Sequence, residues 1–126
     1  MEPKQEPKQD KLAGLRVLVI EDESMVNLLL QDMLEDAGCS VVGSASRLQE
    51  AVEKARALSF DLAILDVNLN GERSFPVAEL LSERGVSCVF VTGYGSASLP
   101  PSFRSIPVLQ KPFLQADLER ALRAAV

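Results

Sequence analysis

Short apolar segments alternate with helix-length apolar stripes along most of the chain. The segments are rich in β-branched and aliphatic residues, as in "LRVLVIED" and "FDLAILD", and are bounded by polar or turn-forming residues. They predict strands at residues 15–22, 39–45, 60–66 and 86–93 and a weaker strand at 105–110. Apolar residues recurring every three or four positions predict helices at residues 26–37, 48–58, 76–84 and 114–125. Strands that are apolar on both faces indicate a parallel sheet covered by helices on both sides, so we expect a doubly wound (βα)5 α/β fold.

Several residues predict where the helices begin and end. Gly38 and Gly85 stand where the first and third helices should stop, and Pro76 suits the first turn of the third. Ser46, with Gln49 three residues later, resembles a capping box for the second helix. Glycines and prolines in residues 93–105 leave about two helical turns before Pro100, so we expect a short, mobile fourth helix.

Length and composition indicate one small domain. Residues 1–12 repeat an E-P-K-Q pattern and are expected to form a disordered tail, which leaves residues 13–126 as the folded domain. No apolar run approaches the roughly 20 residues of a membrane span, and the start does not resemble a secretory signal, so a cytoplasmic location is expected. Cys39 and Cys88 are expected to be buried thiols, and the chain has no histidine. A net charge of −5 argues against nucleic-acid binding.

Polar residues stand where the predicted strands end. The first strand ends in Glu21 and Asp22, the third in Asp66, the fourth in Thr92, and the fifth is followed by Lys111. In an open parallel α/β sheet, ligands bind at the carboxyl ends of the strands, so these side chains should meet at one edge.

Each of these residues also has a purely structural explanation, as a helix cap or a turn residue. Caps and turns do not explain why three carboxylates should crowd together, because like charges oppose one another's ionisation unless a cation lies between them. Hard oxygen ligands suit Mg²⁺. Within such a site Asp66 could act as a nucleophile and form an acyl phosphate, while Lys111 and the hydroxyl of Thr92 bind phosphoryl oxygens. Asn68 is placed to offer its backbone carbonyl to the metal.

The segments "VLVIEDE", "LAILDVNLNG", "FVTGYG" and "LQKPF" together resemble the response-regulator receiver domain of two-component signalling. The resemblance covers residues 15–126 and implies a flavodoxin-like five-stranded sheet of order 2-1-3-4-5. It implies a phosphoacceptor rather than an enzyme, one that assists its own phosphorylation and dephosphorylation, with a cis Lys111–Pro112 bond. The implied roles are phosphoacceptor for Asp66, switch hydroxyl for Thr92, phosphoryl binding for Lys111, and Mg²⁺ binding for Glu21, Asp22, Asp66 and the carbonyl of Asn68.

One departure from the family pattern concerns the switch. The family commonly has an aromatic residue three positions before the lysine, where this chain has Val108. Tyr94 follows the threonine closely instead, which resembles a subgroup with a Phe-x-Thr-Gly-x motif that is often paired with histidine kinases of the HWE type. We expect Tyr94 to reorient as the switch aromatic; the alternative is a surface aromatic without a role.

The resemblance also implies partners. No segment follows the last helix, so we expect a single-domain regulator that signals through a non-covalent target or acts as a phosphoryl sink or relay, as a monomer or weak dimer. A sensor histidine kinase would dock near the first helix. The downstream target would bind the surface of the fourth helix, fifth strand and fifth helix, where apolar contact would come from Leu99, Phe103, Val108 and Leu114.

Two other classes of protein remain as alternatives. A haloacid-dehalogenase-type phosphatase uses similar residues, but its nucleophile strand comes first with a D-x-D pattern, whereas here the acidic pair precedes Asp66. A pseudo-receiver that binds partners without phosphorylation is the second, and the intact Asp66, Thr92 and Lys111 argue against it.

Overall fold

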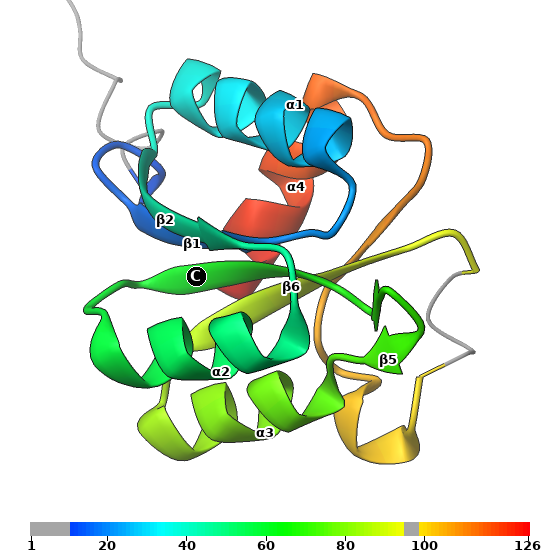
Figure 1. The fold of residues 1–126 in the computed structure, drawn as a ribbon. Helices are drawn as coiled ribbons and strands as arrows, with labels where there is room; N and C mark the ends of the chain where they lie inside the picture. Colours follow the sequence, from blue (N-terminus) through cyan, green and yellow to red (C-terminus); the bar gives the residue numbers. More distant parts are fainter. Residues whose placement is uncertain (1–10, 95–98) are drawn as a thin grey trace, which may run out of the picture.

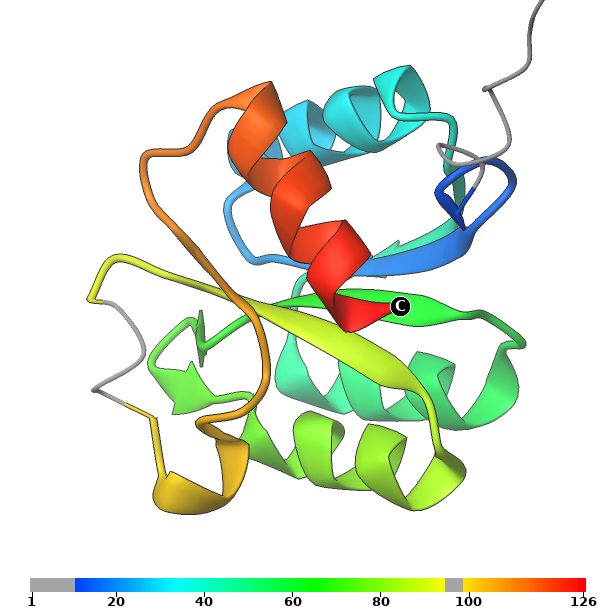
Figure 2. The same cartoon turned by 180° about the vertical axis from the view of Figure 1, so that it is seen from behind.

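A computed structural model describes residues 11–94 and 99–126 of the chain. Its centre is a five-stranded parallel sheet with the order β2-β1-β3-β6-β7 (Figures 1 and 2). This is the predicted order 2-1-3-4-5 once the two short strands β4 and β5 are set aside. The sheet strands are β1 (Arg16–Ile20), β2 (Ser40–Ala45), β3 (Leu62–Asp66), β6 (Ser87–Thr92) and β7 (Val108–Gln110).

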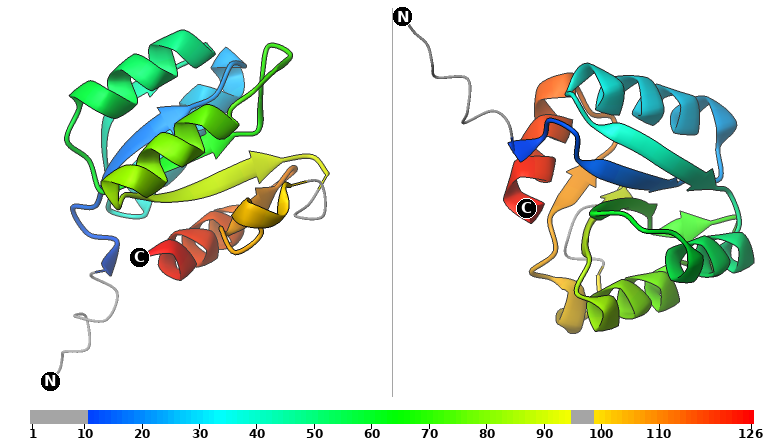
Figure 3. Two further views of the ribbon diagram at one scale, coloured as in Figure 1. Left: turned by 90° about the horizontal axis from the view of Figure 1, so that it is seen from below. Right: turned by 90° about the vertical axis from the view of Figure 1, so that its left-hand side faces the viewer.

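Among residues 11–94 and 99–126, four α-helices cover the two faces of the sheet. Figure 3 shows α2 and α3 on the opposite side of the sheet from α1 and α4. The helices are α1 (Ser24–Asp36), α2 (Leu48–Ala57), α3 (Phe75–Arg84) and α4 (Gln115–Ala125). The doubly wound α/β fold predicted from the apolar pattern is therefore confirmed.

The continuous apolar runs of the central strands supply two separate cores. Along β1, Leu18 and Ile20 face the α2–α3 layer, while Val17 and Val19 face the α1–α4 layer, and all four are 0% exposed. Successive side chains of a strand point to opposite faces, so a strand buried on both sides needs apolar residues at every position. Both thiols are free and buried, and burial raises the pKa of the Cys88 thiol to about 12.

The helix ends agree with the glycine signals but not with the predicted capping box. Gly38 and Gly85 adopt φ of +95° and +71°, a left-handed conformation that favours glycine at a helix end. At the start of α2 the prediction was wrong in detail. The Ser46 N–H donates to the carboxylate of Glu50 at 3.0 Å, and Gln49 takes no part. The acidic side chain one position further along therefore satisfies the free backbone donor.

The predicted fourth helix differs from what the described residues show. Residues 95–98, on which part of that prediction falls, lie outside the described residues. Among residues 99–107 the helical element is a 3-10 helix, η3 (Pro101–Phe103). The Phe103 ring stacks on Phe75 at a centroid distance of 5.4 Å and packs edge-on against Phe90 at 5.8 Å. These contacts pack η3 against the α2–α3 core next to β6.

A small antiparallel hairpin follows β3 and was not predicted. Its strands β4 (Asn68–Leu69) and β5 (Glu72–Arg73) pair Asn68 with Arg73. Asn70 and Gly71 connect them with φ of 55° and 89°. Two consecutive positive φ values belong to the type I′ turn, for which Asn-Gly is the preferred sequence.

The folded unit begins earlier than the sequence predicted. The Leu12 side chain is only 1% exposed and belongs to the α1–α4 core, so the tail boundary at residue 12 was placed too late. Residues 1–10 lie outside the described residues. Among the residues described, no helix is both long enough and apolar enough to cross a membrane.

Truncating Leu12 tests this boundary. Leu12→Ala should lower the free energy of unfolding by about 2–5 kcal/mol, because it leaves a cavity in a packed core. Lys11→Ala, at an exposed neighbour, should change it by less than about 0.5 kcal/mol. Urea unfolding measures both, and equal small effects would place Leu12 outside the core.

Candidate functional site

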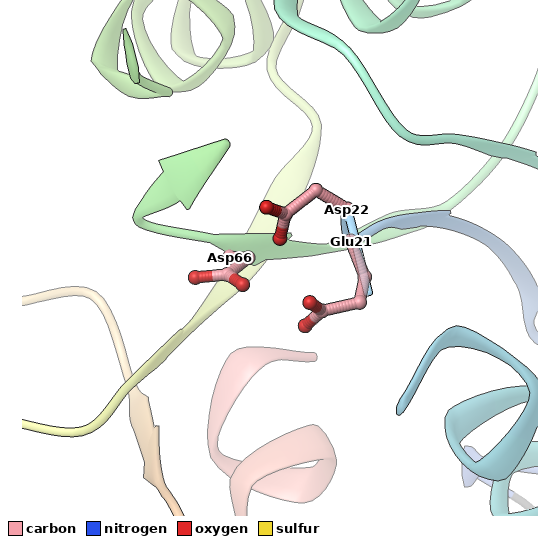
Figure 4. A group of neighbouring side chains, drawn as sticks. All are labelled: Glu21, Asp22 and Asp66. Atoms are coloured by element: carbon pink, nitrogen blue, oxygen red, sulfur yellow. The ribbon is translucent and has the colours of Figure 1, made fainter. Parts of the chain in front are cut away.

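Strand register brings the predicted site residues to one edge of the sheet. Ile20 pairs with Leu65, so Glu21 and Asp22 leave β1 beside Asp66 at the end of β3. Figure 4 shows the three carboxylates gathered at these two strand ends. One oxygen from each lies within 4.8 Å of the others. The convergence expected from the sequence is present in the structure.

The amine and the hydroxyl arrive by the same logic on the other side of β3. Asp66 pairs with Val91 of β6, so the next residue, Thr92, lies beside the end of β3. Thr92 in turn pairs with Gln110 of β7, so the next residue, Lys111, lies beside Thr92. The Lys111 N–H donates to the Thr92 carbonyl at 2.9 Å. The Lys111–Pro112 bond is cis, as the resemblance implied.

Lys111 is the counter-charge of the acidic cluster. Its Nζ lies 3.3 Å from Asp66 Oδ2, 3.7 Å from Glu21 Oε1 and 3.8 Å from Glu23 Oε1. Burial disfavours the charged ammonium, but the three carboxylates outweigh this effect and raise the pKa of Lys111. The ammonium is therefore held charged among three acids.

Glu21 is the most buried member of the cluster. Its side chain is 0% exposed, and Oε2 accepts a hydrogen bond from the Glu23 N–H at 3.1 Å. The other oxygen, Oε1, has no hydrogen-bond partner among residues 11–94 and 99–126. Burial, reinforced by Asp66, raises the pKa of the Glu21 carboxyl to about 8, although the Glu23 N–H and Lys111 oppose the shift.

Backbone amides fix the other oxygens of the site. The Asn68 N–H donates to Asp66 Oδ1 at 3.1 Å, and the Asn70 N–H donates to Asp22 Oδ2 at 3.0 Å. Both donors belong to the β4–β5 hairpin, which thus ties the end of β3 to the end of β1. The Thr92 side chain is 4% exposed, and its Oγ1 accepts a hydrogen bond from the Tyr94 N–H at 3.1 Å.

These residues surround an open cavity of about 470 Å³. The lining residues are Asp22, Glu23, Asp66, Val67, Asn68, Arg73, Thr92, Gly93, Tyr94 and Lys111. Glu23 and Arg73 were not predicted to belong to the site. Glu23 directly follows the acidic pair and was detectable on that ground, but Arg73 reaches the cavity only through the hairpin.

The donor set fits Mg²⁺. Three carboxylates offer hard oxygen atoms within a small volume, and Oε1 of Glu21 is buried without a hydrogen-bond donor. A buried, unpartnered carboxylate oxygen is costly, and a divalent cation removes both that cost and the repulsion between the acids. Mg²⁺ typically binds one or two carboxylates and keeps other positions for water and phosphoryl oxygens.

The predicted surface residues are only partly exposed. Tyr94 and Leu114 are 85% and 73% exposed, and Val108 is half-buried. Leu99 and Phe103, in contrast, are 2% and 7% exposed and belong to the α2–α3 core. The prediction that these two residues offer apolar contact to a partner was therefore wrong, because both side chains pack into this core.

Comparisons with known proteins identify the family that this fold and site define. The sequence model described as "Response regulator receiver domain" matches residues 17–123. The chain therefore belongs to the response regulator receiver domain family. Receiver domains are signalling domains, and they bind Mg²⁺ at an acidic pocket of the kind formed here. The phosphatase alternative is thereby set aside.

Individual relatives agree with this assignment. The transcriptional regulatory protein PdtaR of Mycobacterium tuberculosis is 36% identical over 121 residues, which are 93% of this chain and 59% of PdtaR. The solution structure of SdrG from Sphingomonas melonis Fr1 is 40% identical, with a TM-score of 0.79, and the match covers 88% of this chain and 95% of that one. The BeF3-activated conformation of SdrG, from Pseudomonas melonis Fr1, gives a TM-score of 0.76 and covers 89% and 96%.

The buried Glu21 predicts a pH dependence of stability without metal. Its pKa is about 8 in the folded protein against 4.5 ordinarily, so folding binds a proton and stability falls as pH rises from about 4.5 to 8. Glu21→Gln should remove this fall. The free energy of unfolding of the variant, relative to that of the parent, should therefore rise by more than about 1 kcal/mol between pH 5 and pH 8.

Urea unfolding in EDTA at several pH values measures the difference. Excess Mg²⁺ should make the parent the more stable of the two proteins at pH 8, since the cation stabilises the ionised carboxylate of Glu21. Parallel pH profiles for the parent and Glu21→Gln would contradict burial of the Glu21 carboxyl as the cause of its raised pKa.

Proposed function

We propose that this receiver domain accepts a phosphoryl group on Asp66 from a sensor histidine kinase in a Mg²⁺-dependent reaction. The observation that carries the proposal is the position of the Asp66 carboxylate, 3.3 Å from the Lys111 ammonium and inside the cluster with Glu21 and Asp22. Such a carboxylate is a nucleophile whose surroundings can neutralise an incoming phosphoryl group.

The proposed step is an in-line transfer. An Asp66 oxygen forms a bond to phosphorus as the bond from phosphorus to the donor nitrogen breaks, and the electron pair remains with the donor. Lys111 turns from the carboxylates to a phosphoryl oxygen, and the hydroxyl of Thr92 donates to another. Glu21, Asp22, Asp66 and the Asn68 carbonyl would hold Mg²⁺, which supplies charge neutralisation to the transferred group.

Thr92 couples the phosphoryl group to the loop after β6. Its Oγ1 accepts the Tyr94 N–H, so movement of the hydroxyl toward Asp66 changes the backbone of the next two residues. Tyr94 is exposed and free to reorient, and Val108 offers no ring to perform that role. We assign Tyr94 as the switch aromatic on this ground. The BeF3-activated conformation solved for SdrG supports an activated state in a relative that is 40% identical.

The partners of this cycle follow from the same proposal. The kinase is of the HWE type and docks near α1, and an unknown protein target reads the loop after β6. The protein acts in the cytoplasm as a sink, relay or adaptor, and as a monomer or weak dimer. The pseudo-receiver alternative differs in one respect, because its partner binding would not depend on Asp66.

Replacing the phosphoacceptor tests the proposal directly. Asp66→Asn should take up no label from acetyl phosphate and Mg²⁺, because an amide is not a nucleophile toward phosphorus here. Asp32→Asn, at an exposed aspartate of α1, should label like the parent. The measurement is phosphoprotein formation by mass spectrometry, and equal labelling of Asp66→Asn would reject the site.

Replacing the lysine separates metal binding from the response. Lys111→Ala should still bind Mg²⁺, since it removes a cation from an acidic cluster, but should lose the chemical-shift response of residues 92–108 to BeF3⁻. Lys11→Ala, which changes net charge equally at an exposed site, is the matched control. A response in Lys111→Ala equal to the parent's would count against the lysine's role.

A further inference from the structure

We propose that Arg73 is a further phosphoryl-binding residue of this site, which contacts the group on Asp66 and slows its hydrolysis. The inference rests on the proposed function, because it requires an aspartyl phosphate at Asp66. Neither the motifs nor the strand-end pattern points to Arg73, which precedes the N-cap of α3 by one residue in the chain.

The β4–β5 hairpin places Arg73 at the cavity. Arg73 pairs directly with Asn68 across the hairpin, and residues directly opposite in an antiparallel pair extend to the same face. Both residues line the cavity that Asp66 and Lys111 also line. The hairpin is held to the site by the hydrogen bonds to Asp66 and Asp22 described above, so this placement is anchored at two points.

The charges of the cavity leave Arg73 as the available cation. Lys111 lies within 4 Å of three carboxylates. Among the part of the chain that the structure describes, no carboxylate oxygen lies within 4 Å of the Arg73 guanidinium. A phosphoryl dianion would give this guanidinium a partner, and its planar fork of donors matches phosphate oxygens.

Position decides which step Arg73 affects. Asp66 is 5% exposed at the floor of the cavity, whereas Arg73 and Tyr94 are exposed. In hydrolysis, a water oxygen forms a bond to phosphorus on the side opposite Asp66. The bond from phosphorus to the Asp66 oxygen breaks, which gives the Asp66 carboxylate and dihydrogen phosphate. The water must approach from the open side, where an arginine bound to the phosphoryl oxygens lies in its path. Arg73 therefore protects the aspartyl phosphate.

The test compares Arg73→Ala, Arg73→Lys and the parent with BeF3⁻ and Mg²⁺ by isothermal titration calorimetry. Arg73→Ala should bind BeF3⁻ about tenfold more weakly, the loss expected for one charge-assisted hydrogen bond. Its acyl phosphate, formed with acetyl phosphate, should decay several-fold faster after the donor is removed. Mg²⁺ affinity without BeF3⁻ should not weaken, and Arg73→Lys should fall between the two. Arg56→Ala, which removes the same charge from an exposed site on α2 outside the cavity, should behave like the parent.

Each other outcome overturns the proposal. Unchanged BeF3⁻ affinity and decay in Arg73→Ala would remove Arg73 from the site, and slower decay would make it an aid to hydrolysis. If Arg56→Ala changed BeF3⁻ affinity and the decay rate as much as Arg73→Ala does, the effect would come from net charge and not from the position of Arg73. If the parent itself binds no BeF3⁻, or if Asp66→Asn binds it equally, the proposed phosphorylation of Asp66 fails as well. If the parent binds BeF3⁻ through Asp66 but Arg73→Ala behaves like the parent, only the role of Arg73 fails. Urea midpoints confirm that every variant is folded.

Discussion

The site depends on the electrostatic cost of placing ionised carboxylates together where strands end. Asp66 and the wholly buried Glu21 bring two acids into a region that water does not fully reach, and Asp22 adds a third from the rim. Like charges at this separation cannot all be ionised without positive charge nearby. Lys111 supplies part of that charge, but Glu21 Oε1, 3.7 Å from the Lys111 Nζ, still accepts no hydrogen bond among the described residues.

The fold imposes this arrangement rather than merely permitting it. Parallel strands in register end level with one another, so residues that follow β1, β3, β6 and β7 meet whatever their separation along the chain. The apolar runs that precede them fix the register, because both faces of the central strands are buried and a slip of one residue would expose or misplace the core. The packing that stabilises the two cores therefore also sets the geometry of the site.

The sequence was informative where hydrophobic runs are long and uninformative where elements are short. Asp66 could be placed because it ends a segment with a clear strand pattern, and Lys111 because it follows the weaker strand pattern of residues 105–110. Arg73 could not, because strands of two residues have no periodicity to detect, although Asn70-Gly71 was a usable turn signal. Leu12 was assigned to the tail because the polar E-P-K-Q segment precedes it, and one buried leucine leaves no periodic pattern. Phe103 was taken for a surface residue because the family resemblance implied a partner surface there, whereas only the packing with Phe75 and Phe90 reveals its burial.

The measurement that tests the central claim most directly is a crystal structure of the protein with Mg²⁺ and BeF3⁻. We expect the metal among the carboxylates of the acidic cluster, beryllium bonded to an Asp66 oxygen, and the Lys111 ammonium within hydrogen-bonding distance of a fluorine. Density for either group at another place, or a Lys111 side chain still turned to Glu21 and away from the fluorides, would contradict the account.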